Sequence, residues 1–139
     1  MSDPGVALVE AARALVGCPF RLHGRDPATG LDCVGLVSAA LEGSGTRPVV
    51  PRGYGLRNTG ISQWLPLAER SGLVPASGPV HPGEVLLIAL AHSQHHLVIA
   101  ADAAMVIHAH AGLRRVVIQP FDTAWQIHAK WRCPLQTES

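Results

Sequence analysis

Apolar positions recur at helical spacing in two stretches near the N-terminus. In residues 6–16 they return every three or four positions, and Asp3-Pro4 is typical of an N-cap followed by proline in the first helical turn. A second stretch with this spacing follows Asp32 and ends at Gly43 and Gly45. The pattern predicts two helices, the second with Cys33 as its first residue.

The pattern changes to that of strands after residue 80. Residues 81–84 (His-Pro-Gly-Glu) are typical of a turn, and five apolar or alternating segments follow it. The predicted strands are Val85–Leu90, His96–Ala100, Ala104–His110, Arg115–Ile118 and residues 127–133. Helices followed by an antiparallel meander predict an α+β fold, and we expect one domain over residues 1–139.

Three segments between these elements carry weaker signals. Residues 18–30 and 46–60 are rich in glycine and proline and are interpreted as loops, the second long and on the surface. Apolar residues from Trp64 to Ala68 favour a short helix that ends near Gly72.

Composition and charge exclude several classes of protein. The 139 residues are 47% hydrophobic and 15% charged, which is typical of a globular chain and not of a disordered one. A formal net charge of +1 provides no field for nucleic acid or an anionic membrane, and no apolar run is long enough for a membrane span. Residues 1–17 lack a basic start and contain Glu10 and Arg13, so we expect synthesis in the cytoplasm without a signal peptide.

Cys33 is the candidate nucleophile. The three cysteines, Cys18, Cys33 and Cys133, form neither a disulfide framework nor a paired zinc motif, although a bridge between Cys18 and Cys133 stays open. The free N–H groups and the dipole at a helix N-terminus favour a thiolate, which predicts that Cys33 is the most reactive thiol. The alternative is a small buried apolar residue.

Histidines on a predicted hairpin could serve that thiol as base and orienting group. If the turn is centred on Asp102, His96 lies directly opposite His108, and His110 lies on the same face. The alternatives are a hydrogen-bonded strand histidine, a solvated loop or a zinc site. The imidazoles for zinc would be His92, His95, His96, His108 and His110, but they lack the His-Glu-x-x-His spacing and a clear carboxylate ligand, so we expect no metal and no cofactor.

Taken together, five segments resemble motifs of the NlpC-type cell-wall cysteine peptidases. Residues 15–21 and 30–37 resemble a G-x-P-Y segment followed by D-C-S-G-L-V. The other three segments, 82–87, 96–100 and 106–109, resemble P-G-D-L-V-F, H-V-G-I-Y and x-I-H-A. The resemblance implies a reduced papain-like α+β fold. It also implies cleavage of peptidoglycan stem peptides, commonly at the γ-D-glutamyl–diaminopimelate bond.

Carried over by position, the resemblance makes Cys33 the nucleophile, His96 the base and His108 the third member of a Cys-His-His triad. It implies oxyanion and substrate contacts at Phe20, Arg21, His23, Asp32 and His110.

Two positions depart from the family's pattern. Phe20 replaces a tyrosine whose hydroxyl is usually placed near the oxyanion, and Arg21 or His23 could replace that donor. Val34 replaces the serine after the nucleophile, which we interpret as tolerated packing.

A narrower resemblance concerns residues 108–112, 116–117, 125 and 131–134, which are similar to phage-type peptidases encoded beside tail genes of phages and gene transfer agents. It implies phage-like tail or baseplate proteins as partners, and action on the cell wall as a virion or tail component. Two alternatives to the peptidase stay open: a catalytically weak, peptide-binding part of a tail tip, and an amidase or acyltransferase on the same scaffold.

Overall fold

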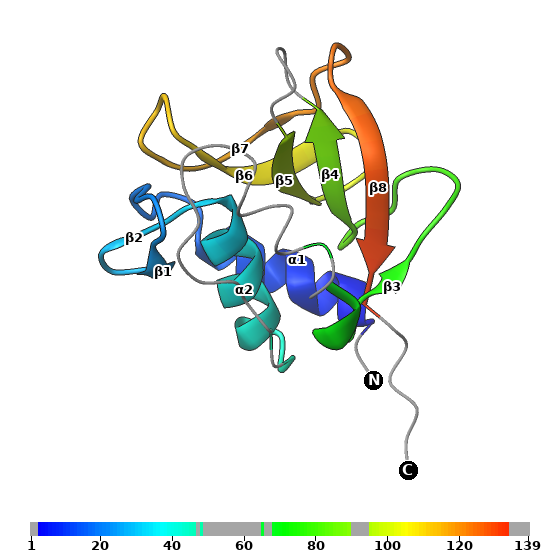
Figure 1. Ribbon diagram of the computed structural model, residues 1–139, viewed down its shortest axis with the longest axis horizontal. Coiled ribbons are helices and arrows are strands. Elements are labelled where there is room, and N and C mark those ends of the chain that lie inside the picture. The colour runs from blue at the N-terminus through cyan, green and yellow to red at the C-terminus, as the bar shows by residue number, and fades with distance from the viewer. Residues whose placement is uncertain (1–2, 47, 49–64, 66–67, 90–94, 134–139) are drawn as a thin grey trace.

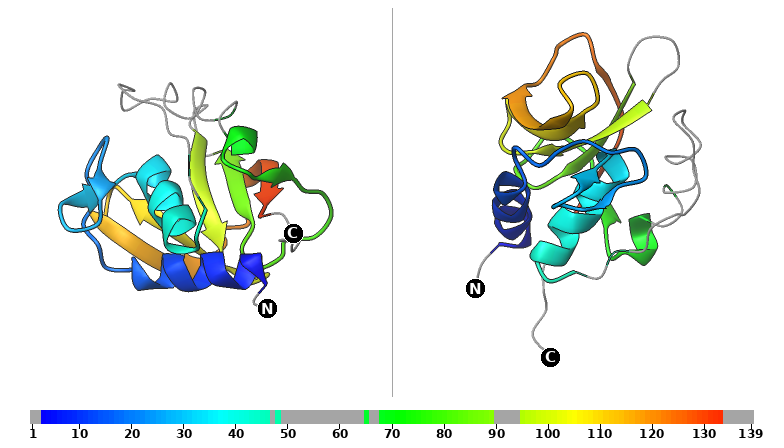
Figure 2. Two further views of the ribbon diagram at one scale, coloured as in Figure 1. Left: turned by 90° about the horizontal axis from the view of Figure 1, so that it is seen from below. Right: turned by 90° about the vertical axis from the view of Figure 1, so that its left-hand side faces the viewer.

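Two helices pack on one side of an antiparallel sheet, as Figures 1 and 2 show. The computed structural model describes residues 3–46, 48, 65, 68–89 and 95–133. Helix α1 (Pro4–Ala14) has Asp3 as N-cap, and helix α2 (Cys33–Gly43) has Asp32. Both start where the sequence predicts. Among the described residues, no helix is both long and apolar enough to cross a membrane.

The main sheet has six strands in the order β3-β8-β4-β5-β6-β7. Their bounds are β3 (Val74–Pro75), β4 (Val85–Ala89), β5 (His95–Ala100), β6 (Met105–His110), β7 (Arg115–Pro120) and β8 (Gln126–Arg132). A separate two-stranded hairpin, β1 (Arg25–Asp26) with β2 (Gly30–Leu31), lies beside α2.

Alternation along the strands divides the apolar side chains into two clusters. Odd-numbered residues of β5 and β6, such as Leu97 and Ile107, join the core formed with α1 and α2. Even-numbered residues, such as Val98 and Val106, form a smaller cluster with Phe121 and Trp125. Helix α2 is buried along most of its length because it packs against α1, β5 and β6.

The α+β prediction is confirmed, with helices first and an antiparallel sheet after them. Hairpin β1–β2 and strand β3 were not predicted, because two-residue strands leave almost no periodic signal. Nearly all of the predicted loop 46–60 lies outside the described residues, as do Trp64, Leu90 and His92. Within the predicted helix near residue 70, residues 68–70 are helical.

The predicted register of the histidine hairpin is wrong: β6 is displaced by two residues relative to β5. The observed pairs are Ile99 with Ile107 and Ala100 with Val106, so the turn is centred one residue later than Asp102. The Asp102 carboxylate accepts from the N–H groups of Ala104 and Met105 and thereby lengthens the turn. A shift of this size moves a strand by two residues relative to its partner, so every side chain keeps its face.

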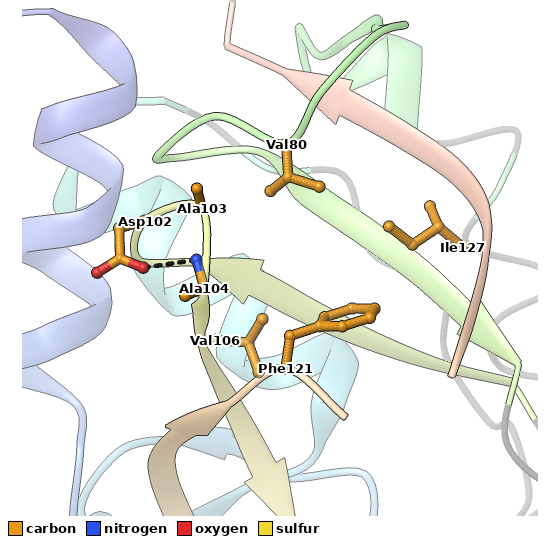
Figure 3. A pocket seen from close by; sticks show the side chains of 7 residues that line it. All are labelled: Val80, Asp102, Ala103, Ala104, Val106, Phe121 and Ile127. Carbon is orange, nitrogen blue, oxygen red and sulfur yellow. Dashed lines mark hydrogen bonds between the residues drawn. The ribbon is translucent and has the colours of Figure 1, made fainter. Parts of the chain in front are cut away.

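The same turn borders a shallow pocket on the sheet face that carries the smaller cluster, drawn in Figure 3. Its lining is mostly apolar and comprises Val80, Asp102, Ala103, Ala104, Val106, Phe121 and Ile127. The Asp102 carboxylate is already engaged with backbone N–H groups of its own turn. The pocket therefore offers no reactive group.

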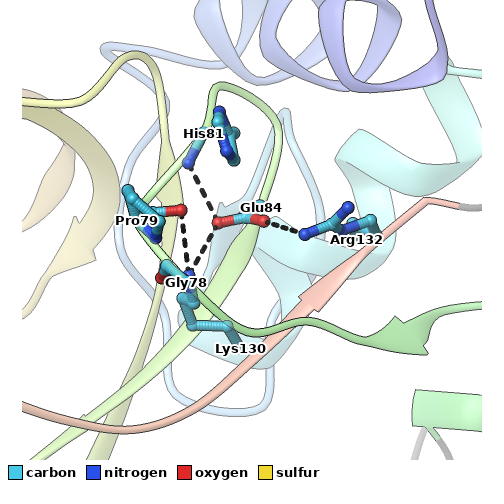
Figure 4. A network of polar contacts seen from close by, with 6 residues as sticks. All are labelled: Gly78, Pro79, His81, Glu84, Lys130 and Arg132. Atoms are coloured by element: carbon cyan, nitrogen blue, oxygen red, sulfur yellow. Dashed lines mark hydrogen bonds and ion pairs between the residues drawn. The ribbon is translucent and has the colours of Figure 1, made fainter.

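A buried carboxylate joins the turn before β4 to the last strand. Glu84 is 1% exposed and accepts from the N–H of His81, while its oxygens lie 3.4 Å from Lys130 Nζ and 3.3 Å from Arg132 Nη2. Figure 4 shows Lys130 also turned toward the carbonyls of Gly78 and Pro79. These contacts compensate the charge that the fold buries.

Replacing Glu84 with glutamine should strongly destabilise the protein. An amide cannot balance the charge of Lys130, whose side chain is 8% exposed, and breaking a buried pair costs on the order of 3–5 kcal/mol. Urea denaturation followed by circular dichroism measures the loss. Glu42→Gln, at an exposed position, is the matched control and should change little. Equal stabilities of the two variants would contradict this role for Glu84.

Candidate active site

Asp32 fixes the start of α2 and the loop in front of it. Its carboxylate accepts from Gly35 N at 2.8 Å and from His23 N at 2.9 Å, and it lies 3.1 Å from Arg25 Nη1. The carbonyl of Gly24 lies over Gly35 so closely that a Cβ there would be 2.0 Å from its oxygen. These contacts hold Cys33 at the first position of the helix, as the sequence predicts.

Cys33 packs against the main core and keeps partial exposure. Its sulfur lies against the backbone N–H of Leu97, the residue after His96, which places α2 next to the start of β5. The pKa of the Cys33 thiol is raised to about 12, mainly by burial and also by the Asp32 carboxylate, and the backbone N–H groups and Arg25 only partly oppose this shift. The expectation of a resting thiolate is therefore wrong, because desolvation outweighs the helix N-terminus.

The histidines form a hydrogen-bonded chain across three neighbouring strands. His96 Nε2 lies 2.9 Å from His108 Nδ1, and His108 Nε2 lies 2.7 Å from Gln119 Oε1. His108 is 4% exposed, and its ring and that of Trp125 are nearly perpendicular at a centroid distance of 5.8 Å. The structure thus brings His96 and His108 together, although they are not directly opposite in the register.

Both imidazoles are held in their neutral form. The pKa of His96 is lowered to about 3, mainly by burial and to a smaller extent by the neighbouring His108 and His110. Burial also lowers the pKa of His108. No hydrogen bond joins Cys33 to His96 among the contacts of the described residues. At rest the candidate site therefore contains a neutral thiol and neutral imidazoles.

The other predicted site residues fall into two groups. Asp32 is buried and engaged with Arg25, and Phe20 packs against the core with its N–H bonded to the carbonyl of Arg114. Arg21 and His23 are exposed, and His23 has a φ of 64°, which is rare outside glycine.

His110 lies at the end of β6. Its Nδ1 accepts from Leu113 N, and its ring centroid is 5.4 Å from that of His108. His110 therefore contacts the hydrogen-bonded histidines through His108, and its hydrogen bond to Leu113 stabilises the turn after β6.

The other cysteines and histidines bear on two alternatives, a disulfide bridge and a zinc site. All three cysteines are free, so Cys18 and Cys133 are not bridged. Among the described residues, no group of three or more histidine, cysteine, aspartate or glutamate side chains is arranged to hold a metal. His95 and His128 do meet at the surface, with 3.3 Å between Nε2 and Nδ1, where β8 bulges and leaves residue 128 outside its pairing with β4.

Sequence reasoning missed three residues of this site: Arg25, Gln119 and Trp125. The predicted strand ended at Ile118 because Pro120 signals a turn, so Gln119 was left outside it. In the structure, β7 continues through Gln119 to Pro120. Arg25 was assigned to a loop, and Trp125 entered through the resemblance to phage-type peptidases, with no site role. Nothing in the local pattern of these residues distinguishes them.

Solved structures with the same fold include several NlpC/P60 domains. NlpC2 from Trichomonas vaginalis matches 95% of this chain and 47% of its own, with a TM-score of 0.68 and 16% identity. The NlpC/p60 domain of the peptidoglycan hydrolase SagA matches 88% and 95%, with a TM-score of 0.62 and 22% identity. The peptidoglycan hydrolase RipB from Mycobacterium tuberculosis matches 93% and 63%, with a TM-score of 0.58 and 19% identity.

This chain spans about half the length of NlpC2. No family model matches the sequence, and no curated protein matches it either. At these identities the similarity establishes the fold: the chain has the α+β architecture of NlpC/P60 domains, with helices packed on an antiparallel sheet.

Replacing Asp32 with asparagine should lower the pH at which Cys33 is alkylated. Asparagine keeps the N-cap but removes a negative charge that raises the pKa of the thiol, and it leaves the positive charge of Arg25 in place. The alkylation rate of Cys33 in each protein is measured against pH by iodoacetamide labelling and peptide mapping. Cys18 and Cys133 are internal controls whose profiles should not move. An unchanged or higher midpoint for Cys33 would contradict this account.

Proposed function

We propose that this protein is a cysteine peptidase that hydrolyses stem peptides of bacterial peptidoglycan. One observation carries the proposal. A cysteine at a helix N-terminus lies against the residue that follows a histidine, and that histidine is hydrogen-bonded to a second one. A nucleophile, a base and a group that orients the base are the parts that acyl transfer requires. The fold shared with the peptidoglycan hydrolases SagA and RipB supports the choice of substrate.

The first chemical step begins from neutral groups. As Cys33 Sγ bonds to the peptide carbonyl carbon, its proton passes to the unprotonated nitrogen of His96, and the carbonyl π electrons move to oxygen. His96 is then an imidazolium in a buried site, a state disfavoured in the free protein. The enzyme–substrate complex therefore has to stabilise the His96 imidazolium and the oxyanion, and neither charge exists at rest.

The remaining steps return the enzyme to its starting state. The backbone N–H of Cys33 at the open end of α2 is one donor to the oxyanion. Collapse of the tetrahedral intermediate breaks the C–N bond, and the departing amine takes the proton from His96. Water then gives a proton to His96 and attacks the thioester, and the proton returns to sulfur as the acid leaves.

The finer assignment follows the sequence resemblance. We propose the γ-D-glutamyl–diaminopimelate bond as the scissile bond, and association with a phage-like or gene-transfer-agent tail that delivers the protein to the cell wall. The similarity of residues 108–112 and 131–134 to phage-type peptidases supports this assignment.

A second candidate is a peptide-binding part of a tail tip with weak activity. Two observations favour it: the phenyl ring of Phe20 has no hydroxyl to donate, and the Cys33 and His96 pKa values are shifted away from an ion pair. An amidase or acyltransferase on the same scaffold would use the same nucleophile but leave different products.

Digestion of purified peptidoglycan, followed by mass spectrometry of the muropeptides, should reveal peptides cut within the stem. Cys33→Ala and His96→Ala should abolish release, because one removes the nucleophile and the other the base. His108→Ala should leave residual activity, because it removes only the orienting group. Circular dichroism confirms that each variant folds. Products cut between sugar and peptide would indicate an amidase, and binding without release would indicate the tail-tip component.

Replacing Phe20 with tyrosine should raise kcat. The ring packs against the core in either case, but tyrosine adds a hydroxyl, and one oxyanion donor is typically worth on the order of 10²–10³ in kcat. Steady-state kinetics on a stem-peptide substrate measures the change, and thermal denaturation checks that stability is kept.

Arg21→Ala and His23→Ala serve as the companion variants to Phe20→Tyr. If Phe20→Tyr has no effect and one of these variants slows the reaction, that residue supplies the donor instead. Wild-type rates in all three variants would exclude this loop from oxyanion stabilisation.

A further inference from the structure

We propose that Gln119 is a positioning residue that fixes the tautomers of His108 and His96, so that Nδ1 of His96 is the nitrogen that accepts the Cys33 proton. The inference rests on the proposed function, because it names which atom of the base acts. It adds a fourth member to the predicted Cys-His-His arrangement.

The geometry connects the three side chains in one line. Gln119 Oε1 lies 2.7 Å from His108 Nε2, and His108 Nδ1 lies 2.9 Å from His96 Nε2. On the paired strands, Val106 faces Gln119 and Val117 faces His108, so His108 and Gln119 are diagonal neighbours on one face of the sheet. Both distances are within the range of good hydrogen bonds.

The chemistry of the amide oxygen determines where each proton lies. An amide oxygen only accepts, so His108 Nε2 must carry a proton. A neutral imidazole has one N–H, and therefore His108 Nδ1 is unprotonated and must accept a hydrogen bond from the Nε2–H of His96. His96 Nδ1 is then unprotonated as well, and of the four ring nitrogens of His96 and His108 it is the one free to act as a base.

If the side-chain amide of Gln119 were flipped, every hydrogen bond of the series would run in the opposite direction. Its NH₂ group would donate to His108 Nε2, and His108 Nδ1–H would donate to His96 Nε2. The proton of His96 would then lie on Nδ1, and no base would remain for Cys33. Only the orientation with Oε1 toward His108 is compatible with a functioning pair.

The surroundings explain why a neutral acceptor suits this position. His108 is 4% exposed, and His110, which lies beside it, would be a like charge when protonated. Burial and His110 lower the pKa of His108, while the hydrogen bond to Gln119 raises it. Among the described residues no carboxylate acts on the pKa of either imidazole. The tautomer is therefore set without charging His108.

Two variants separate this role from simple packing. Gln119→Met keeps the length of the side chain but cannot accept from Nε2–H, so kcat/KM should fall, by up to about 10⁴-fold if the base takes the wrong tautomer. Gln119→Glu restores an acceptor and should recover most of that loss at high pH. Gln126→Met, on the exposed part of β8, is the matched control and should keep the wild-type rate.

The pH profile of Gln119→Glu is the decisive kinetic measurement. A carboxylate raises the pKa of His108, and the resulting imidazolium donates from Nδ1 to His96 Nε2. The remaining proton of His96 then lies on Nδ1, which inactivates the base. The acid limb of kcat/KM should therefore move to higher pH. A packing role predicts an unmoved acid limb, and that result would overturn the proposal.

Nitrogen-15 NMR of the histidine rings tests the tautomers without substrate. In the wild-type protein at neutral pH, His96 and His108 should both carry their proton on Nε2, and in Gln119→Met His108 should change to the Nδ1–H form. A wild-type His96 with its proton on Nδ1 would overturn the inference. If the tautomers are as proposed and peptidoglycan is not cleaved, the proposed function fails and the role of Gln119 in setting the tautomers stands.

Discussion

The carboxylate of Asp32 is the contact on which the candidate site depends. It accepts a hydrogen bond from the N–H of Gly35 in the first turn of α2 and another from the N–H of His23. It also forms an ion pair with Arg25. Without it, the loop before the helix and the helix itself would lose the carboxylate that both bind. The same charge lies beside Cys33 and makes the thiol harder to ionise. The site thus gains its geometry from a group that opposes its reactivity.

Burial gives the pair of catalytic candidates its resting state. Both the thiol and the imidazole are shifted toward their neutral forms, in opposite directions on the pH scale. A neutral pair is stable inside a protein, since no isolated charge has to be compensated. In the proposed reaction, the bound peptide and the oxyanion contacts have to stabilise the charge separation that attack requires. A thiol held in its neutral form reacts slowly with alkylating and oxidising agents, because the thiolate is the reactive form.

The sequence allowed the fold class, the start of both helices and the proximity of His96 to His108 to be predicted, because each depends on local signals. An aspartate before an apolar helix and an alternating strand are readable one segment at a time. The register of the histidine hairpin was wrong because Asp102 lengthens its turn through two hydrogen bonds.

The resting charge state and the position of Gln119 were beyond prediction for another reason. Desolvation depends on how the helices and the sheet pack together, and Gln119 acts through a neighbour on another strand. Both are properties of the assembled structure and not of any one segment. Arg25 and Trp125 belong to the same class, since their contacts cross from one element to another.

The two halves of the candidate site come from different parts of the chain. The histidines and Gln119 lie on β5, β6 and β7, three consecutive strands joined by short turns, whereas Cys33 comes from a helix docked on that sheet. A local opening between helix and sheet would separate sulfur from imidazole while leaving the meander and its hydrogen bonds intact. The proposed activity would therefore depend on the closed helix–sheet interface, and it would disappear before the sheet unfolds.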